Sequence, residues 1–328
     1  MRRWWWLLLG LCSPAVVLAA VSRPALAPPP LYQQVAGGEE DCEVPGKTTL
    51  SILAAEKGVK WTVVAKQNGL KKPYKITTGM VLKINTKHIV PAELDSGLVI
   101  NLPELILYRF ANGVYQRRYS LAVGKPSWPT PTGSFKIGEK RRNPTWNVPE
   151  SIQEEMEEQG LEVVEQVPPG PKNPLGKFWM GTTASGVGIH ATNRPWSVGY
   201  YVSHGCIRML PEEIEQLFPQ IEVGTPVKII YRPIKMALTP QGRVYLEVHP
   251  NIYNWRYEAR EVVKELAQRH GLQNLLDWEK VAAVLKAKEG VAQDITLEPR
   301  REPVQAGDSS RPRESRLGPL QGQKAGLE

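Results

Sequence analysis

The residues Ser203–Arg208 hold the densest set of reactive side chains in this sequence. They read Ser-His-Gly-Cys-Ile-Arg, so a thiol, an imidazole and a guanidinium fall within six residues. If the stretch is extended, His204 and Cys206 point to the same face, because side chains alternate along a strand, and Gly205 lets a substrate approach the backbone. A second histidine, His190, lies sixteen residues upstream of the cysteine. A cysteine with a separate histidine is the minimum for nucleophilic catalysis by a thiolate, provided that the fold brings the two runs together.

At these residues the sequence resembles the L,D-transpeptidase catalytic-domain family of the YkuD type, in the envelope group of ErfK, YbiS, YcfS and YnhG. The family pattern runs His-Gly-Thr-Asn, a proline, Ser-(Ile/Val)-Gly, and then Ser-His-Gly-Cys-(Ile/Val)-Arg-(Met/Leu). Ala191 stands where the family has glycine; the family uses the backbone carbonyl of that residue to orient the histidine, and alanine offers the same carbonyl. The matching residues are His190, Thr192, Asn193, Pro195, Ser197, Val198, Gly199, Ser203, His204, Gly205, Cys206, Ile207, Arg208 and Met209.

The resemblance implies a role for each side chain of the site. Cys206 would be the nucleophile, and His190 would accept and then return its proton. His204 would help to shape the oxyanion site, with the backbone N–H groups of Gly205 and Cys206 as donors. Arg208 would either bind a substrate carboxylate or brace the loop. The candidate substrate-binding residues are Ser203, Asn193 and Trp196. We expect the hydroxyl of Ser203 to form hydrogen bonds rather than to act as a second nucleophile.

The activity that the resemblance implies is that of a peptidoglycan L,D-transpeptidase. Cys206 would attack the carbonyl of the third residue of a tetrapeptide stem, release the terminal D-alanine, and transfer the acyl group to an amine. That amine would belong to another stem, giving a cross-link, or to a lysine of an envelope lipoprotein; with water as acceptor the enzyme would be an L,D-carboxypeptidase. The implied partners are stem peptides, glycan and such a lipoprotein, with no cofactor.

Two functions of other classes remain open. His190, His204 and Cys206 would together supply three ligands for zinc, as in a zinc peptidase, although the sequence has no His-Glu-x-x-His motif. The chain would otherwise be a wall-binding protein without catalytic activity. Covalent labelling of the thiol by an acylating agent distinguishes these two classes from the transpeptidase.

The first 27 residues have the pattern of a secretory signal peptide. Arg2 and Arg3 precede a short apolar run, and Ala25–Ala27 has the small-x-small form of a cleavage site. Cleavage near Ala19 or Ala20 is the alternative, and an uncleaved membrane anchor remains open. Leu11 stands before Cys12 where a lipoprotein signal has a small residue, so we reject lipidation. The pattern predicts export to the periplasm or cell envelope.

The composition is that of a globular protein with a modest positive charge. Of 328 residues, 41% are hydrophobic, and the formal net charge is +8. Basic and acidic residues are interspersed and no nucleic-acid-binding motif is present, so we expect no nucleic-acid partner. Cys42 and Cys206 are the cysteines that follow the leader, and we expect both to remain unpaired.

Residues 28–40 are predicted to be a Pro-rich linker, and residues 41–90 a separable βααβ unit. Gln67–Leu70 and Thr78–Ile84 resemble a lysin motif (LysM), a family that binds glycans containing N-acetylglucosamine. Lys47–Leu50 departs from the usual Gly-Asp-Thr-Leu in a loop that contacts sugar in that family. A purely structural unit therefore stays as the alternative to a peptidoglycan-binding domain.

Residues 96–232 are predicted to be a mostly β catalytic domain, which the resemblance implies is the L,D-transpeptidase β-sandwich. Asn112-Gly113 between two apolar runs predicts a hairpin. An insertion is expected over residues 139–178, with an acidic helix at residues 151–159, and its Asn-Pro-Thr-Trp and Pro-Gly-Pro-x-Asn-Pro-Leu-Gly stretches favour an ordered lid or pocket wall.

Two segments follow the catalytic domain. Residues 233–290 are predicted to be a small α/β subdomain, with a helix that Asp277 caps. Residues 291–328 are polar and rich in Arg, Pro and Gly, and we expect a disordered tail.

Overall fold

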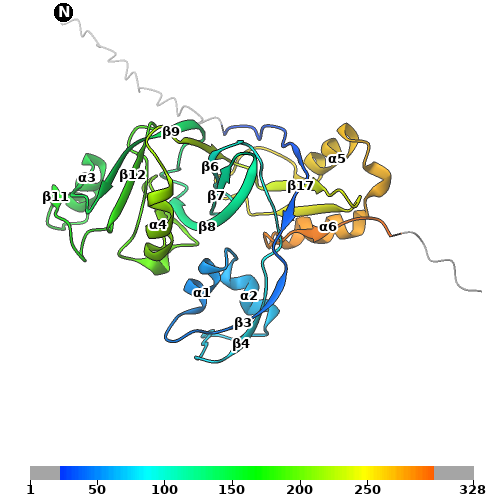
Figure 1. Ribbon diagram of the computed structural model, residues 1–328, viewed down its shortest axis with the longest axis horizontal. Coiled ribbons are helices and arrows are strands. Elements are labelled where there is room, and N and C mark those ends of the chain that lie inside the picture. Colours follow the sequence, from blue (N-terminus) through cyan, green and yellow to red (C-terminus); the bar gives the residue numbers. More distant parts are fainter. Residues whose placement is uncertain (1–22, 299–328) are drawn as a thin grey trace, which may run out of the picture. The chain divides into compact units, whose positions relative to one another are not determined.

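The computed structural model describes residues 23–298 (Figure 1). Most of the predicted signal peptide and most of the predicted tail lie outside the described residues. Within the described range, no helix is long and apolar enough to cross a membrane.

One nine-stranded sheet forms the central region, residues 96–232, and confirms the prediction of a mostly β domain. The long strand β8 pairs with β7 over its first part and with β15 and β14 over its last part, so the sheet turns back on itself. In sheet order the strands are β14 (Tyr201–Ser203), β8 (Val114–Gly124), β15 (Ile207–Met209), β13 (Gly188–His190), β12 (Phe178–Thr182), β9 (Gly133–Arg142), β16 (Pro226–Ile230), β6 (Gly97–Asn101) and β7 (Ile106–Ala111).

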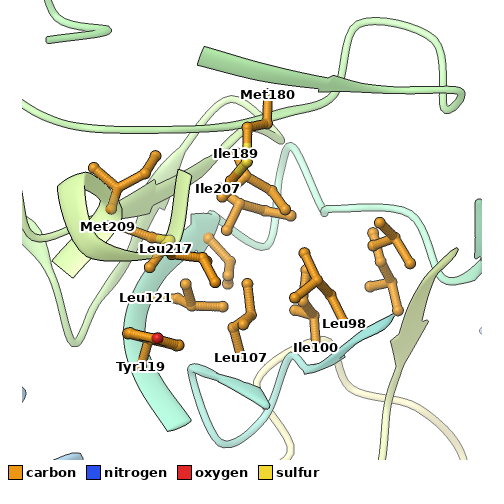
Figure 2. Packing of buried hydrophobic residues seen from close by; sticks show 14 of the residues in the cluster. Leu98, Ile100, Leu107, Tyr119, Leu121, Met180, Ile189, Ile207, Met209 and Leu217 are labelled. Atoms are coloured by element: carbon orange, nitrogen blue, oxygen red, sulfur yellow. The ribbon is translucent and has the colours of Figure 1, made fainter. Parts of the chain in front are cut away.

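Apolar side chains from most of these strands meet in a single core, which Figure 2 shows from close by. Leu98 and Ile100 of β6, Ile189 of β13 and Ile207 of β15 are fully buried in it. Helix α4 (Pro211–Leu217), which begins with proline as predicted, adds Leu217, and the 3-10 turn η2 (Phe218–Gln220) follows. The strands that carry the candidate site are therefore anchored by their inward-facing residues.

The turns around this sheet follow the local sequence. Asn112 and Gly113 have φ angles of 51° and 73°, the left-handed conformation that a tight two-residue hairpin turn requires. The strand expected from Glu104 begins two residues later, because Leu105 has a φ of 63° and leaves the extended conformation.

The N-terminal module has the predicted βααβ order. Its elements are β3 (Glu39–Glu43), α1 (Leu50–Glu56), α2 (Trp61–Gln67) and β4 (Val81–Asn85), and the two strands pair antiparallel. Thr49 caps α1, since its side chain accepts a hydrogen bond from the N–H of Ile52 at 3.3 Å. Cys42 lies half-buried on β3 with a free thiol, as expected.

This module is packed against the central region, which contradicts the expectation of a separable unit. Ser120 Oγ donates to the carbonyl of Ala55 at 2.6 Å, and Arg118 Nη2 donates to the carbonyls of Lys57 and Thr86 at 3.1 and 3.0 Å. Ala55 also joins a small buried cluster with side chains of the central region. The contacts involve the end of α1, which sequence periodicity could not assign to an interface.

The predicted linker and the start of the predicted tail both belong to folded structure. The Pro-rich segment contributes β1 (Leu31–Tyr32), parallel to β17 (Ile234–Leu238), and β2 (Val35–Ala36), which pairs with β5 (His88–Ile89). At the other end, β19 (Gln293–Asp294) lies beyond the predicted boundary at residue 290 and pairs with β18 (Val244–Val248). These corrections share one cause: long-range strand pairing stabilises segments that are too short and too polar to show a strand pattern.

Strands β1, β17, β18 and β19 form a four-stranded sheet, and the C-terminal module adds helices to it. They are α5 (Ala259–Arg269), the 3-10 turn η3 (Gln273–Leu275) and α6 (Trp278–Ala287). Asp277 caps α6 as predicted, with its carboxylate accepting from the N–H groups of Glu279 and Lys280.

The insertion is shorter than expected. Residues 139–142 are part of β9, and Phe178 begins β12, a strand that the sequence did not predict, so the insertion spans residues 143–177. It contains β10 (Trp146–Asn147) paired with β11 (Gln166–Val167), and the acidic helix α3 (Glu150–Glu158). Figure 1 shows α3 and β11 beside β12 in the central region.

Candidate active site

The sheet brings the two chemically active runs together. Strand β13, which ends at His190, lies parallel to β15, which follows Cys206, and His190 stands opposite Arg208 in the register. The fifteen residues between His190 and Cys206 make the crossover between these strands, through the 3-10 turn η1 (Pro195–Ser197) and β14. The proximity that the thiol mechanism requires is thus a result of strand pairing.

Cys206, the candidate nucleophile, lies in a tight loop between β14 and β15. Gly205 has a φ of 106°, and no atom stands within 4 Å of where its Cβ would be, so glycine is needed for backbone conformation rather than for space. Thr130 Oγ1 donates to the carbonyl of Gly205 at 2.8 Å, and Ser203 Oγ donates to the carbonyl of Cys206 at 2.5 Å. Both hydroxyl-bearing residues are buried, and they fix the loop that presents the thiol.

The loop also changes the expected oxyanion site. The N–H of Gly205 donates to Ser203 Oγ at 3.2 Å, so it is already used within the loop. The resemblance implies two donors, the N–H groups of Gly205 and Cys206. Because the first is used in this bond, the N–H of Cys206 remains as the donor for a developing oxyanion.

His190 is held in the tautomer that a general base needs. Its Nδ1 lies 2.5 Å from the carbonyl of Ala191, so Nδ1–H donates and Nε2 keeps its lone pair. Burial, with a smaller contribution from Arg208, lowers the pKa of His190 to about 4, and the imidazole is therefore neutral near pH 7. The carbonyl of Ala191 has the orienting position expected from the resemblance.

The thiol of Cys206 is also neutral at rest. Burial raises its pKa above the usual value, while a hydrogen bond with the backbone of Gly188 and the charge of Arg208 act in the opposite direction. The thiol donates to the carbonyl of Gly186 at 3.3 Å. Among the residues described, no hydrogen bond joins this thiol to His190, so we expect the proton to move only when substrate has bound.

His204 points to the insertion. Its Nε2 lies 2.5 Å from Glu155 Oε2 of helix α3 and 3.3 Å from Lys125 Nζ, and the ring of Trp128 contacts it edge-on at 5.2 Å. The hydrogen bond with His204 and the charge of Lys125 lower the pKa of Glu155. His204 therefore ties α3 to the loop that carries the nucleophile.

A cavity of about 340 Å³ opens at Cys206. Pro144, Thr145 and Trp146 line it, in agreement with the prediction that the Asn-Pro-Thr-Trp stretch forms a pocket wall. Strands β9 and β12 supply the opposite wall, including Trp179. The cavity therefore offers a substrate two indole side chains next to the thiol.

The three predicted substrate-binding residues do not line this cavity. Ser203 is 2% exposed and braces the loop. Asn193 donates to the carbonyl of Lys172 at 3.0 Å and borders a different cavity of about 450 Å³. Trp196 is 58% exposed on η1, away from the thiol cavity. These residues are close to the motif in the sequence, but the fold does not bring them into the cavity.

Arg208 is half-buried next to His190. Its Nη1 lies 3.4 Å from Ser197 Oγ, and within residues 23–298 no carboxylate forms an ion pair with it. The bond with Ser197 supports the bracing role, and binding of a substrate carboxylate by the guanidinium stays a prediction.

The ligand atoms required by the zinc hypothesis do not gather. Within the described range, the one group of three ligand side chains close enough for a metal ion is Glu104, Glu247 and His249, all buried and apart from the thiol. The ammonium of Lys235 already contacts both carboxylates, at 2.9 and 3.0 Å. Neither His190, His204 nor Cys206 belongs to that group.

Sequence reasoning missed several residues of the site. Glu155, Lys125 and Trp128 surround His204, and Glu139 and Arg141 line the thiol cavity. Glu139 and Arg141 are two residues apart, so on a strand they share one face. That spacing could have indicated the pair, but from the sequence this end of β9 is predicted to belong to the insertion. No local signal connects α3 with His204.

Comparison with known proteins identifies the family. Residues 95–229 match the L,D-transpeptidase catalytic domain of the YkuD type. The probable L,D-transpeptidase YbiS of Escherichia coli (strain K12) is 30% identical over 263 residues, which cover 78% of this chain and 83% of YbiS. The probable L,D-transpeptidase YcfS of the same strain is 34% identical over 206 residues, which cover 61% of this chain and 64% of YcfS.

Among solved structures, the catalytic domain from E. faecium L,D-transpeptidase is 24% identical and covers 42% of this chain and 99% of that domain, with a TM-score of 0.33. The assignment rests on the sequence matches together with the motif around Cys206: the chain belongs to the L,D-transpeptidase family and carries that family's catalytic domain.

Proposed function

We propose that this protein is a peptidoglycan L,D-transpeptidase that works through a Cys206 thioester. Neutral His190 takes the thiol proton through Nε2 while the sulfur attacks the carbonyl of the third stem residue. The tetrahedral oxyanion accepts a hydrogen bond from the N–H of Cys206, and Arg208 binds a substrate carboxylate. Collapse breaks the peptide bond, and the imidazolium returns the proton to the leaving amine of D-alanine.

The observation that carries this proposal is the tautomer of His190 beside the thiol strand. A buried imidazole whose Nδ1–H is bound to a carbonyl can use Nε2 only as a base, first toward the thiol and then toward the acceptor. An amine that attacks the thioester must also lose a proton, which the same nitrogen accepts. The cycle therefore closes without a cofactor.

The acceptor is the finer part of the proposal. An amine of a second stem gives a cross-link, an amine of an envelope lipoprotein gives attachment, and water gives an L,D-carboxypeptidase. We favour an amine, because the relatives YbiS and YcfS bear the name of transpeptidases.

The test of the thiol mechanism is a mass measurement with matched variants. Incubation with a tetrapeptide stem, or with a carbapenem, is expected to add acyl mass to the peptide that contains Cys206. Cys206→Ser removes the adduct, and His190→Ala slows acylation by ~10²–10⁴-fold, which is typical for loss of a general base. Strong chelation leaves the rates unchanged. Activity that chelation abolishes, without any adduct on Cys206, would establish the zinc peptidase instead.

We also propose that the protein is exported and that its N-terminal module binds peptidoglycan glycan. The signal pattern and the βααβ order of the module support this. Because the module is packed on the central region, point variants test its role without removing those contacts. The double variant Lys47→Glu with Thr48→Glu lies in the loop that departs from the LysM pattern, and it is expected to weaken binding to isolated sacculi. Exposed Lys83→Glu on β4 is the control. Equal pull-down of both variants and the parent would favour a structural module.

A further inference from the structure

The peptide unit between Gly205 and Cys206 carries the oxyanion donor of the proposed mechanism. Its carbonyl belongs to Gly205 and its N–H belongs to Cys206. Because a trans peptide is planar, the carbonyl and the N–H point in opposite directions, and a rotation of one group rotates the other. The contacts of the Gly205 carbonyl therefore determine where the N–H of Cys206 points.

The nucleophile loop itself fixes only the peptide units on either side. On the preceding unit, the N–H of Gly205 donates to Ser203 Oγ at 3.2 Å, and on the following unit the carbonyl of Cys206 accepts from the same hydroxyl at 2.5 Å. The Gly205 carbonyl accepts from Thr130 Oγ1 at 2.8 Å, and within residues 23–298 no other group donates to it. Since glycine restricts its own backbone little, Thr130 is the contact that holds this peptide.

The hydroxyl of Thr130 has a single orientation that satisfies its neighbours. The N–H of Gly124 donates to Thr130 Oγ1 at 2.9 Å, so the oxygen accepts there and its one hydrogen is left for the carbonyl of Gly205. Thr130 is 2% exposed, so bulk water does not reach these bonds. The hydroxyl thus links the end of β8 to the peptide that carries the oxyanion donor.

The turn that carries Thr130 lies very close to the end of β8. A Cβ on Gly124 would lie 2.1 Å from the carbonyl oxygen of Trp128 and 2.6 Å from the backbone nitrogen of Thr130, so glycine is needed for this approach. Pro129 and Pro131 flank Thr130 and restrict the backbone dihedral angles on both sides of it. The turn is therefore a rigid support for the hydroxyl.

A tyrosine of the C-terminal module joins the two sides of this support. The hydroxyl of Tyr253 donates to the carbonyl of Gly124 at 2.7 Å and accepts from the N–H of Thr130 at 3.3 Å. The ring of Tyr253 stacks on that of Tyr231 with centroids 5.5 Å apart, and its N–H donates to the hydroxyl of Tyr231 at 2.9 Å. The C-terminal module thereby reaches the Gly205 carbonyl through one residue, Thr130.

We propose that Thr130 and Tyr253 are positioning residues that orient the N–H of Cys206 toward the oxyanion. Thr130 fixes the plane of the Gly205–Cys206 peptide, and Tyr253 fixes Thr130. The hydrogen bond from Thr130 also polarises this peptide, which makes its N–H a stronger donor when negative charge develops on the substrate. Neither side chain touches the substrate in this role. The inference rests on the proposed function and extends the support of its active site into the C-terminal module.

The test compares a reaction that needs the oxyanion donor with one that does not. Release of D-alanine from a tetrapeptide stem passes through a tetrahedral oxyanion, whereas iodoacetamide alkylates Cys206 by displacement of iodide at a saturated carbon. Thr130→Val keeps the shape of the side chain and removes the hydroxyl. Its kcat for D-alanine release is expected to fall by about 10–100-fold with KM little changed, since complete loss of an oxyanion donor typically costs ~10²–10³-fold. Its alkylation rate, measured on a Cys42→Ser background, is expected to stay at the parent value.

Two variants control for the substitution itself. Thr130→Ser retains the hydroxyl and is expected to restore most of the D-alanine release. Thr86→Val is the matched control, because Thr86 Oγ1 also accepts from a backbone N–H and donates to a backbone carbonyl, both of Gly38, at 3.2 and 3.1 Å. Thr86 lies in the N-terminal module, so its variant is expected to keep the parent rates of both reactions.

The part played by Tyr253 is tested by a double-mutant cycle. Tyr253→Phe retains the stacked ring and is expected to slow D-alanine release less than Thr130→Val does. The double variant should be no slower than Thr130→Val alone, because both side chains act through the same peptide. Additive losses would show that Tyr253 acts independently of Thr130 and would overturn its assigned role.

Two results would overturn the role of Thr130. An unchanged kcat in Thr130→Val would show that the peptide keeps its orientation without the hydroxyl. A change in the alkylation rate as large as the change in kcat would show that Thr130 only holds the thiol in place. If Thr130→Val does not fold, Tyr253→Phe provides the same comparison of the two reactions. A parent protein that is alkylated at Cys206 but releases no D-alanine from a tetrapeptide stem would contradict the proposed function itself.

Discussion

At the scale of single residues, the site is a pair of neutral groups rather than a preformed ion pair. Burial lowers the pKa of His190 to about 4 and raises the pKa of Cys206 above its usual value, so both shifts disfavour the thiolate–imidazolium form. A neutral thiol is a weaker nucleophile than a thiolate, so it reacts more slowly with oxidants and alkylating agents. Substrate binding must therefore bring the sulfur, the base and the carbonyl together before the proton moves.

This state predicts how Cys206 reacts with iodoacetamide as pH changes. Because the thiolate is the reactive form and the thiol pKa is raised, the logarithm of the rate should increase by about one unit per pH unit between pH 6 and 9. The measurement uses a Cys42→Ser background, since Cys42 is the other free thiol of the described chain. A rate that is already constant near pH 7 would show a thiolate–imidazolium pair and contradict the neutral state.

At the scale of elements, helix α3 is joined to the active-site loop through polar contacts of Glu155. None of its residues is fully buried, and Glu155 joins it to His204 and to Lys125 at 2.5 and 3.5 Å. Partly exposed ion pairs of this kind contribute little to stability. A helix held in this way can leave the loop without disturbing the core of the sheet.

Removal of this contact is predicted to loosen the insertion. In Glu155→Ala, cleavage of residues 143–177 by trypsin and alkylation of Cys206 by a bulky maleimide should both become faster, because the ion pair with His204 and Lys125 is lost. Glu154→Ala removes a neighbouring, exposed carboxylate of the same helix and is the control. Identical cleavage and alkylation in the two variants would show that Glu155 does not hold α3.

At the scale of the whole described chain, a buried ionic network joins segments far apart in the sequence. Lys235 is fully buried, and its ammonium contacts Glu104 at 2.9 Å, Glu247 at 3.0 Å and the carbonyl of Ile89 at 2.7 Å. The C-terminal module also supports the nucleophile loop, because Tyr253 accepts from the N–H of Thr130 at 3.3 Å. The C-terminal module is therefore part of the folded enzyme rather than an appendage.

Loss of the central cation of this network should be costly. Lys235→Met leaves the Glu104 and Glu247 carboxylates buried without their counter-charge, which typically costs ~3–5 kcal/mol of unfolding free energy. The exposed pair of Lys264 with Glu261 provides the comparison, and Lys264→Met should cost below ~1 kcal/mol. Chemical denaturation measures both. A further Glu104→Gln and Glu247→Gln exchange should restore part of the loss, and equal stability of the two lysine variants would refute the importance of the network.

The first described residues also bear on processing of the leader. Leu26 packs against the central core, and its N–H donates to the carbonyl of Arg256 at 3.2 Å. The N–H of Arg256 donates to the carbonyl of Pro24 at 3.0 Å. A chain that begins at Val21 should therefore be more stable than one that begins at Pro28, by about 1–2 kcal/mol for the lost bonds, measured as a difference in Tm. Equal Tm values would remove this argument for cleavage near Ala20 rather than after Ala27.

The sequence by itself determined which residues are candidates for the chemistry, and it determined the local structure. Cys206 and His190, the hairpin at Asn112, the cap at Asp277 and the βααβ order are written in residue types and short spacings, because dihedral preferences and side-chain periodicity act over a few residues.

Only the tertiary structure decided which strands lie side by side. That choice set His190 opposite Arg208, brought Glu139 and Arg141 from a misassigned strand end into the thiol cavity, and placed Glu155 on His204. It also turned the expected linker into strands. Pairing between distant segments depends on the packing of the whole core and leaves no periodic trace in either segment alone, which is why these residues could not be found before the fold was known.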